Sequence, residues 1–214
     1  PQTQTVEITM NVRGWKGETM DVHLPVWRPG RYEVLDPAGS IRSIIARGAD
    51  GKPLAIEKFA KSSWRVATRN SSVVRVTYTL YANAINNRTR HVDDTHAFLS
   101  GSSVFLFVHE LRNNPIELAV KAPDGWKIAS GLEPAPGVPG VLLSPDYDTL
   151  VDSPLEIGLH DTYVYEVDGV RHEIVFWGGS PKDPAPFLRD FALITKAQKD
   201  IFGKFPHSRY VFLT

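Results

Sequence analysis

Near its start the chain reads Val6-Glu7-Ile8-Thr9-Met10-Asn11-Val12, and apolar and polar side chains alternate throughout. A period of two places the apolar side chains on one face of an extended strand, so this stretch predicts a strand with one buried face. The alternation returns over residues 20–24 after a glycine-bounded turn at residues 14–17. We expect these two strands to pair as a hairpin.

Further short stretches rich in β-branched and aromatic residues predict strands at 41–46, 54–59, 64–67, 73–81, 104–108, 116–122 and 155–159. Clusters of Gly, Pro, Asn and Asp separate them, as expected for turns. Four prolines between residues 134 and 145 predict a loop. Many short strands with no helix among them predict an antiparallel β-sandwich or a curved sheet over residues 1–160.

The pattern changes after residue 160. Residues 163–177 predict a hairpin that turns at Asp168-Gly169. A helix follows, with Asp183 as its cap, Pro184 at its first position and Gly203 at its end. Its apolar residues recur at spacings of three and four, at Phe187, Phe191, Ile194, Ala197 and Ile201.

A strand at residues 209–213 comes last, so residues 161–214 predict the first elements of an α+β domain. We expect a fragment of a longer protein, because this domain lacks further elements. The helix face and the last strand would then be left uncovered, and self-association through them is expected.

Composition excludes several classes of protein. Lys plus Arg and Asp plus Glu are equal at 24 each, so no nucleic-acid partner is expected. Cysteine is absent, which rules out disulfides and thiolate metal ligands within the sequence. The longest strongly apolar run is 104–108, far below the roughly 20 residues of a membrane-spanning helix.

The densest polar cluster is His91-Val92-Asp93-Asp94-Thr95-His96. Two imidazoles and two carboxylates could ligate a metal, but the His-x4-His spacing suits neither one helical face nor alternate positions of one strand. We therefore expect no metal in this cluster. A solvated loop and a loop that meets a ligand are both open, and the second makes Asp93, Asp94 and His96 candidate substrate-binding residues.

Residues 24–32 place Trp27, Arg28 and Arg31 around a Pro-Gly turn. One interpretation is a sharp corner with Trp27 in the core, and the other gives Arg28 or Arg31 a carboxylate partner, and so a role in substrate binding. His109-Glu110 begins an H-E-x-x-H zinc motif, but Asn113 stands where the second histidine belongs. No complete catalytic site is predicted.

Five segments in order resemble the N-terminal part of the glycyl aminopeptidase family, zinc metallopeptidases similar in plan to aminopeptidase N. They are 24–32 (LPVWRPGRY), 76–83 (VTYTLYAN), 93–98 (DDTHAF), 150–158 (LVDSPLEIG) and the helix end at 201–203 (IFG). The resemblance covers essentially the whole chain.

The resemblance implies an N-terminal β domain, then a thermolysin-like catalytic domain and often a PDZ-like domain beyond Thr214. It implies zinc bound by H-E-x-x-H and a distant glutamate in the longer protein, and no cofactor or activity in this fragment, which lacks that motif. It also implies a peptide substrate with a free N-terminus, glycine preferred, whose ammonium group Asp93 or Asp94 could hold. Many relatives are exported, so a bacterial periplasm is slightly favoured over the cytoplasm.

A second function stays open. Five Trp and seven Tyr could furnish an aromatic face, making the chain a β-sandwich binding module for carbohydrate or protein. Most of these aromatics fall in predicted strands, where core packing is the usual role. A reading frame that continues into H-E-x-x-H would favour the peptidase, and a stop codon after Thr214 would favour the module.

Overall fold

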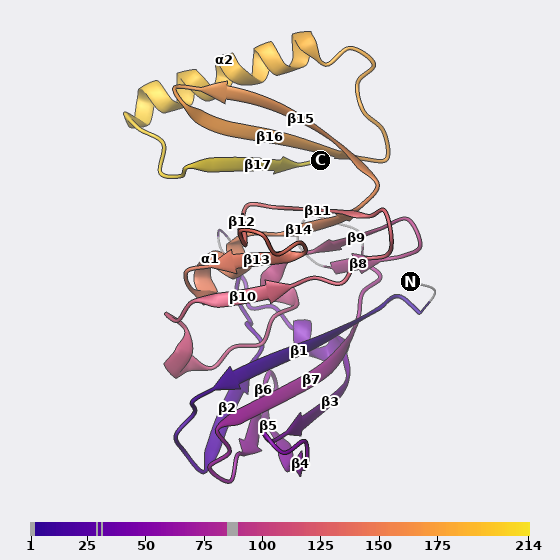
Figure 1. Cartoon of the computed structure of the whole chain (residues 1–214), viewed down its shortest axis with the longest axis vertical. Coiled ribbons are helices and arrows are strands. Elements are labelled where there is room, and N and C mark those ends of the chain that lie inside the picture. Colours follow the sequence, from indigo (N-terminus) through magenta and orange to yellow (C-terminus); the bar gives the residue numbers. More distant parts are fainter. Residues whose placement is uncertain (1–2, 29, 31, 85–89) are drawn as a thin grey trace.

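The computed structural model describes residues 3–28, 30, 32–84 and 90–214, and Figure 1 shows their strands in successive layers with one long helix at the end. Residues 5–81 form two antiparallel sheets. The first sheet has the order β1 (Thr5–Arg13), β7 (Val73–Tyr81), β3 (Ile41–Arg47) and β4 (Pro53–Leu54). The second has the order β2 (Thr19–His23), β6 (Ser63–Ala67) and β5 (Ile56–Ala60). A 3-10 turn, η1 (Pro37–Ser40), precedes β3.

The inward faces of these strands follow the period of two in the sequence. Along β7, every second side chain is buried: Val74, Val76, Tyr78 and Leu80. β2 and β6 contribute Met20, Val22, Trp64 and Val66 to the same core. The prediction of a mainly β fold with half-buried strands is therefore confirmed.

The hairpin predicted from the first two strands is wrong. β1 pairs along its whole length with β7, and β2 pairs with β6 in the other sheet. The turn between them crosses from one sheet to the other and is held by residues 68–72, since Gly14 N donates to Ser72 O at 2.8 Å and Thr68 N donates to Glu18 O at 2.8 Å. Alternation identifies the buried face of a strand, but it carries no information about the partner strand.

Two smaller antiparallel sheets follow. One has the order β11 (Lys127–Ser130), β14 (Leu155–Gly158), β9 (His96–Leu99) and β8 (Arg90–Val92). The other has the order β10 (Ile116–Ala119), β13 (Val141–Ser144) and β12 (Glu133–Pro134). The short helix α1 (Tyr147–Asp152) was not predicted; the Asp146 side chain caps it by accepting from Thr149 N at 2.7 Å.

The strand predicted at 104–108 is absent; these residues lie between the 3-10 turns η2 (Gly101–Ser103) and η3 (His109–Leu111). All five side chains are buried. Two tyrosine hydroxyls satisfy backbone groups that a strand would pair with its neighbour. Tyr78 donates to Val104 O at 2.8 Å and accepts from Leu106 N at 3.1 Å, and Tyr147 donates to Phe105 O at 2.6 Å. The apolar run predicted burial correctly, but in place of a strand it forms a single antiparallel bridge, in which Phe107 and His23 exchange backbone hydrogen bonds at 2.8 and 2.9 Å.

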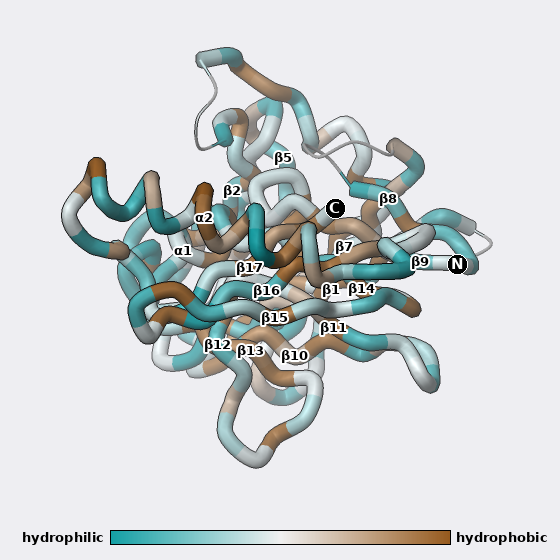
Figure 2. Tube along the Cα trace, turned by 90° about the horizontal axis from the view of Figure 1, so that it is seen from above, coloured by the Kyte–Doolittle hydropathy of each residue, from teal (hydrophilic) through white to brown (hydrophobic). Residues whose placement is uncertain are grey.

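The last unit is a three-stranded sheet covered by a helix, and Figure 2 shows its strands side by side. Its elements are β15 (His160–Val167), β16 (Val170–Trp177), α2 (Ala185–Phe202) and β17 (Arg209–Leu213). β15 and β16 form the predicted hairpin, whose turn residues Asp168 and Gly169 have φ of 50° and 79°. β17 pairs in parallel with β16, so the last strand is not unpaired.

α2 ends where expected, at Gly203 with φ of 82°, and begins one residue later than expected, with Pro184 as its N-cap and Ala185 as its first residue. Asp183 still contributes at this end, since its Oδ1 accepts from Ala185 N at 3.1 Å. Phe187 and Phe191 pack against the sheet. Ile194 and Ile201, expected on the same face, are exposed instead. Among the described residues, no helix has the length and apolar character needed to cross a membrane.

Candidate functional site

The hairpin formed by β8 and β9 brings His91 and His96 together. His91 pairs with Phe98 across the two strands, so His96 is the diagonal neighbour of His91 on the same face. The centroids of the two imidazole rings lie 5.2 Å apart. The sequence argument against a shared site assumed that both histidines lie on a single helix or strand. That assumption is wrong, because the two histidines lie on the two strands of a hairpin with Asp93 in its turn.

Asp93 forms the turn of this hairpin. Its Oδ1 accepts from Thr95 N, Thr95 Oγ1 and His96 N at 2.8, 2.6 and 3.1 Å, and its Oδ2 accepts from His91 Nε2 at 2.9 Å. Burial alone would raise the pKa of Asp93, but these hydrogen bonds outweigh it and hold the pKa well below its usual range. The carboxylate of Asp93 is therefore engaged within the hairpin.

Asp94 has the opposite character. Its side chain is exposed, and no hydrogen bond or ion pair to another described residue engages it. Of the two neighbouring carboxylates, Asp94 is the one free to meet a cation from outside.

His96 is held from two sides. Its Nδ1 lies 2.8 Å from Oε1 of the buried Glu156 on β14, and its ring stacks on the indole of Trp177 at the end of β16, with centroids 3.5 Å apart and an interplanar angle of 11°. Burial raises the pKa of Glu156, and the hydrogen bond from His96 opposes this only in part. β14 approaches closely at Gly158, where an added Cβ would lie 2.9 Å from His96 Cβ.

Glu156 and Trp177 were not predicted as part of the cluster. The one local signal was a charged residue between apolar neighbours in Leu155-Glu156-Ile157, since a carboxylate on a buried strand needs a partner. Trp177 carried no such signal, because a tryptophan ending a strand is usually a packing residue.

The cluster His91, Asp93 and His96 could hold a metal ion. One potential ligand atom from each residue lies within 4.8 Å of the corresponding atoms of the other two. His91 Nδ1 and His96 Nε2 are buried and have no hydrogen-bond partner.

Of the two predicted arginines, the structure describes Arg28. Arg28 is half-buried in the segment after β2 and takes part in an interaction of its own. The polar contacts of the cluster described above come from β8, the turn, β9 and β14, and do not include it. Arg31 lies outside the residues that the structure describes. The neighbouring Trp27 packs against the core, and the Arg112 guanidinium lies 5.0 Å from its ring centroid, which supports the interpretation of this segment as a corner.

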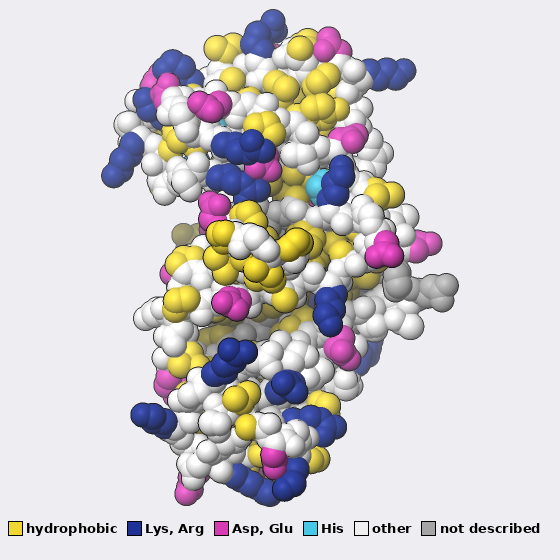
Figure 3. Space-filling view, in the orientation of Figure 1, with side chains coloured by type: hydrophobic (Ala, Val, Ile, Leu, Met, Phe, Trp, Pro, Cys, Tyr) yellow, Lys and Arg dark blue, Asp and Glu magenta, His cyan; other side chains and the backbone are white. Residues whose placement is uncertain are grey.

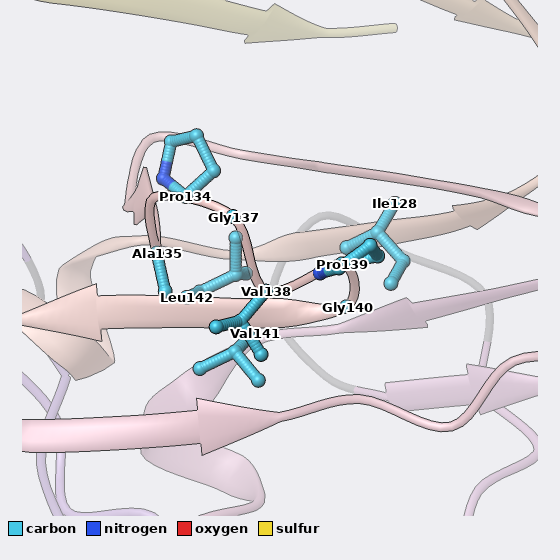
Figure 4. A pocket seen from close by; sticks show the side chains of 9 residues that line it. All are labelled: Ile128, Pro134, Ala135, Gly137, Val138, Pro139, Gly140, Val141 and Leu142. Carbon is cyan, nitrogen blue, oxygen red and sulfur yellow. The ribbon is translucent and has the colours of Figure 1, made fainter.

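A concave feature elsewhere on the molecule carries no reactive group. A hollow of about 470 Å³ lies beside the loop between β12 and β13, and Figure 4 shows the side chains that line it. All nine lining residues are apolar or glycine, among them Pro134, Val138 and Leu142. Figure 3 shows acidic and basic side chains interspersed over the visible face, in line with the balanced composition. The histidine and carboxylate cluster is therefore the stronger candidate site.

The layered β architecture, followed by a helix-covered sheet, is similar to that of an aminopeptidase N family protein of known structure. Residues 1–159 match the sequence model of the peptidase M61 N-terminal domain. The chain belongs to this family, and the resemblance to a peptidase N-terminal domain is confirmed.

Solved structures agree with this assignment. An aminopeptidase N family protein from Idiomarina loihiensis is 27% identical, with a TM-score of 0.92 over 99% of this chain and 37% of that chain. An M1 zinc metallopeptidase mutant from Deinococcus radiodurans, bound to a Tyr-Ser-Ala substrate, is 13% identical, with a TM-score of 0.52 over 98% of this chain and 51% of that chain. The second likeness shows the fold alone. No curated protein sequence gives a significant match.

Proposed function

We propose that this chain is the N-terminal part of a zinc aminopeptidase that removes N-terminal residues, glycine by preference, from peptides. The observation that carries the proposal is the similarity to the Idiomarina protein over nearly the whole chain, together with the family match. The chain spans only 37% of that protein and about half of the Deinococcus enzyme, which leaves room for a catalytic domain in a longer protein.

We further propose a domain boundary near residue 160. Two separate hydrophobic cores support it, one built from residues of the first 157 and the other from residues between 165 and 212. The family match also ends at residue 159. Residues 161–214 would then begin the catalytic α+β domain, and the exposed Leu193, Ile194, Ile201 and Phe202 on α2 would be covered by its remaining elements.

This chain does not supply the catalytic zinc site that the resemblance implies. Its sequence holds no H-E-x-x-H, and the donor set at His91, Asp93 and His96 is a different one. We therefore propose zinc for the longer protein and no peptidase activity for these 214 residues alone.

Within this proposal the β domain contributes to recognition of the substrate's ammonium group. Asp94 is the residue best suited, because it is an exposed carboxylate with no described partner. Asp93 would act indirectly, since its four hydrogen bonds shape the turn that presents Asp94.

The test begins with the reading frame after Thr214 and then uses the longer protein. We expect H-E-x-x-H in the continuation, hydrolysis of glycyl peptides that stops when the N-terminus is acetylated, and no hydrolysis by the 214-residue chain. Asp94→Asn should raise KM for peptides with a free amine and leave kcat nearly unchanged. Asp124→Asn, in an exposed turn, is the control.

A stop codon after Thr214 would instead favour the binding-module interpretation, for which carbohydrate or protein ligands would be screened. Unchanged kinetics in Asp94→Asn would remove Asp94 from substrate recognition without affecting the assignment to a peptidase family.

A further inference from the structure

The cluster of His91, Asp93 and His96 has the composition of a metal site, although the spacing of these residues in the sequence did not predict one. Two imidazoles and one carboxylate converge from β8, the turn and β9, with a potential ligand atom of each within 4.8 Å of the others. Imidazole and carboxylate donors together suit Zn²⁺ and neighbouring divalent transition metals.

Burial supplies an independent observation. The His91 and His96 residues are only 6% and 3% exposed, yet Nδ1 of His91 and Nε2 of His96 have no hydrogen-bond partner. A buried polar atom without a partner is costly, and native structures rarely leave one. A cation bound by the cluster would satisfy Nε2 of His96, whereas the hydrogen bonds within the cluster leave this atom without a partner.

The surroundings of His96 fit the role of a ligand. The carboxylate of Glu156 binds Nδ1, which leaves Nε2 as the free nitrogen; metal-ligating histidines are commonly oriented by a carboxylate on the opposite ring nitrogen. Trp177 stacks on the ring and limits its rotation. The absence of a side chain at Gly158 lets β14 approach His96 closely enough for this arrangement.

We propose that His91, Asp93 and His96 bind one divalent transition metal ion, with Zn²⁺ as the first candidate, and that Glu156 positions His96. Tetrahedral Zn²⁺ with bonds of about 2.1 Å needs ligand atoms roughly 3.4 Å apart. The cluster must therefore contract from at most 4.8 Å by a little over 1 Å, a shift within reach of side-chain rotation.

This proposal rests on the residues of the present chain and does not depend on the catalytic zinc proposed above. The ligands come from the β8–β9 hairpin, and Glu156 on β14 and Trp177 at the end of β16 contact His96, so a bound ion would stabilise the packing of this hairpin against β14 and the last unit. The three ligands leave a fourth position for water or for a group from elsewhere.

The experiment uses the tag-free 214-residue chain, which lacks H-E-x-x-H and therefore reports this site alone. After treatment with a chelator, the chain is titrated with Zn²⁺ in calorimetry or against a chromophoric zinc indicator. We expect saturation at one Zn²⁺ per chain. His91→Gln and His96→Gln should each weaken binding at least tenfold, and Glu156→Gln should weaken it about 10- to 100-fold.

His109→Gln is the matched control, because His109 is an exposed histidine on the same domain and has a histidine neighbour, His23, at 4.8 Å between ring centroids. It should retain the affinity of the unmodified chain. Absence of saturable Zn²⁺ binding, or a loss that follows His109 and spares His91 and His96, would overturn the proposal.

A second measurement uses the unmodified chain, so it remains informative even if the variants fail to fold. In long-range proton–nitrogen spectra of the imidazole rings, Zn²⁺ should shift the ring nitrogens of His91 and His96 and leave those of His109 unchanged. Unshifted His91 and His96 resonances at saturating Zn²⁺ would also refute the site.

Discussion

Arg209 forms a bidentate ion pair with Glu173: Nε donates to Oε1 at 2.7 Å and Nη2 donates to Oε2 at 3.2 Å. Its remaining nitrogen, Nη1, donates to the backbone oxygens of Ser130 and Leu132 at 3.0 and 3.2 Å. One side chain thus joins β17 to β16 and ties the last sheet to the end of β11. It is a specific link between the two hydrophobic cores.

Arg209→Ala should destabilise the chain by about 2 kcal/mol, because it leaves the largely buried Glu173 carboxylate without its main partner. This value lies between those typical of surface ion pairs and of fully buried ion pairs. Arg171→Ala is the control: Arg171 also donates to Glu173 Oε1, at 2.8 Å, but its side chain is 55% exposed. It should cost less than about 1 kcal/mol. Urea unfolding followed by circular dichroism measures both, and equal losses would contradict the special role of Arg209.

The same pair predicts a pH dependence. The hydrogen bond from Arg209 lowers the pKa of Glu173 despite the opposing effect of burial. A folded-state pKa below the unfolded one means that the stabilisation is complete above the ordinary value of 4.5 and is lost as the pH falls through the folded value. The difference in unfolding free energy between the unmodified chain and Glu173→Gln should therefore be constant near neutrality and shrink below about pH 4.5. A difference that stays constant down to pH 3 would count against this.

Tyr78 should be sensitive to loss of its hydroxyl alone. Burial raises its pKa, and the hydroxyl accepts from Leu106 N and donates to Val104 O, two backbone groups outside the bridge between Phe107 and His23. Tyr78→Phe leaves these buried backbone groups unsatisfied and should cost about 1–3 kcal/mol in unfolding free energy. Tyr81→Phe, whose half-buried hydroxyl lies 3.4 Å from Gln4 Oε1, should cost clearly less. Comparable costs would show that water or a shifted backbone replaces Tyr78 readily.

The exposed apolar face of α2 should mediate association of the isolated chain. Ile194, Ile201 and Phe202 are 57%, 77% and 80% exposed. Light scattering coupled to size-exclusion chromatography should show a mass that rises with concentration, and Ile194→Glu combined with Phe202→Glu should restore a monomer. Lys196→Glu on the same helix controls for added charge. A monomer at all concentrations would refute this expectation.

Patterns within a few residues predicted much of the fold. Alternation over 6–12 and 73–81, the Asp168-Gly169 turn, and the Asp183 to Gly203 helix all occur where expected. Each depends on interactions between neighbours in the chain, such as a preferred φ, a capping bond or the burial of one face. These are properties that a short stretch of sequence carries with it.

The candidate site could be predicted only in part. The polar density of residues 91–96 marked the right segment, but as a loop. It indicated neither the approach of His91 and His96 across a hairpin nor their surroundings, since Glu156 and Trp177 are 60 and 81 positions beyond His96. The His-x4-His spacing argues against a shared face on one helix or one strand, but it does not exclude a shared face across a hairpin turn.

Local sequence thus predicted several strands, the Asp168-Gly169 turn and the long helix, since these preferences act between neighbouring residues. Tertiary structure alone decided that β1 pairs with β7 and β2 with β6. It also decided that tyrosine hydroxyls bond the backbone of residues 104–108, and that His96 lies between Glu156 and Trp177. Strand partners and side-chain clusters depend on contacts between distant segments. Many alternative pairings satisfy the same alternation, and only the joint packing of all segments selects among them.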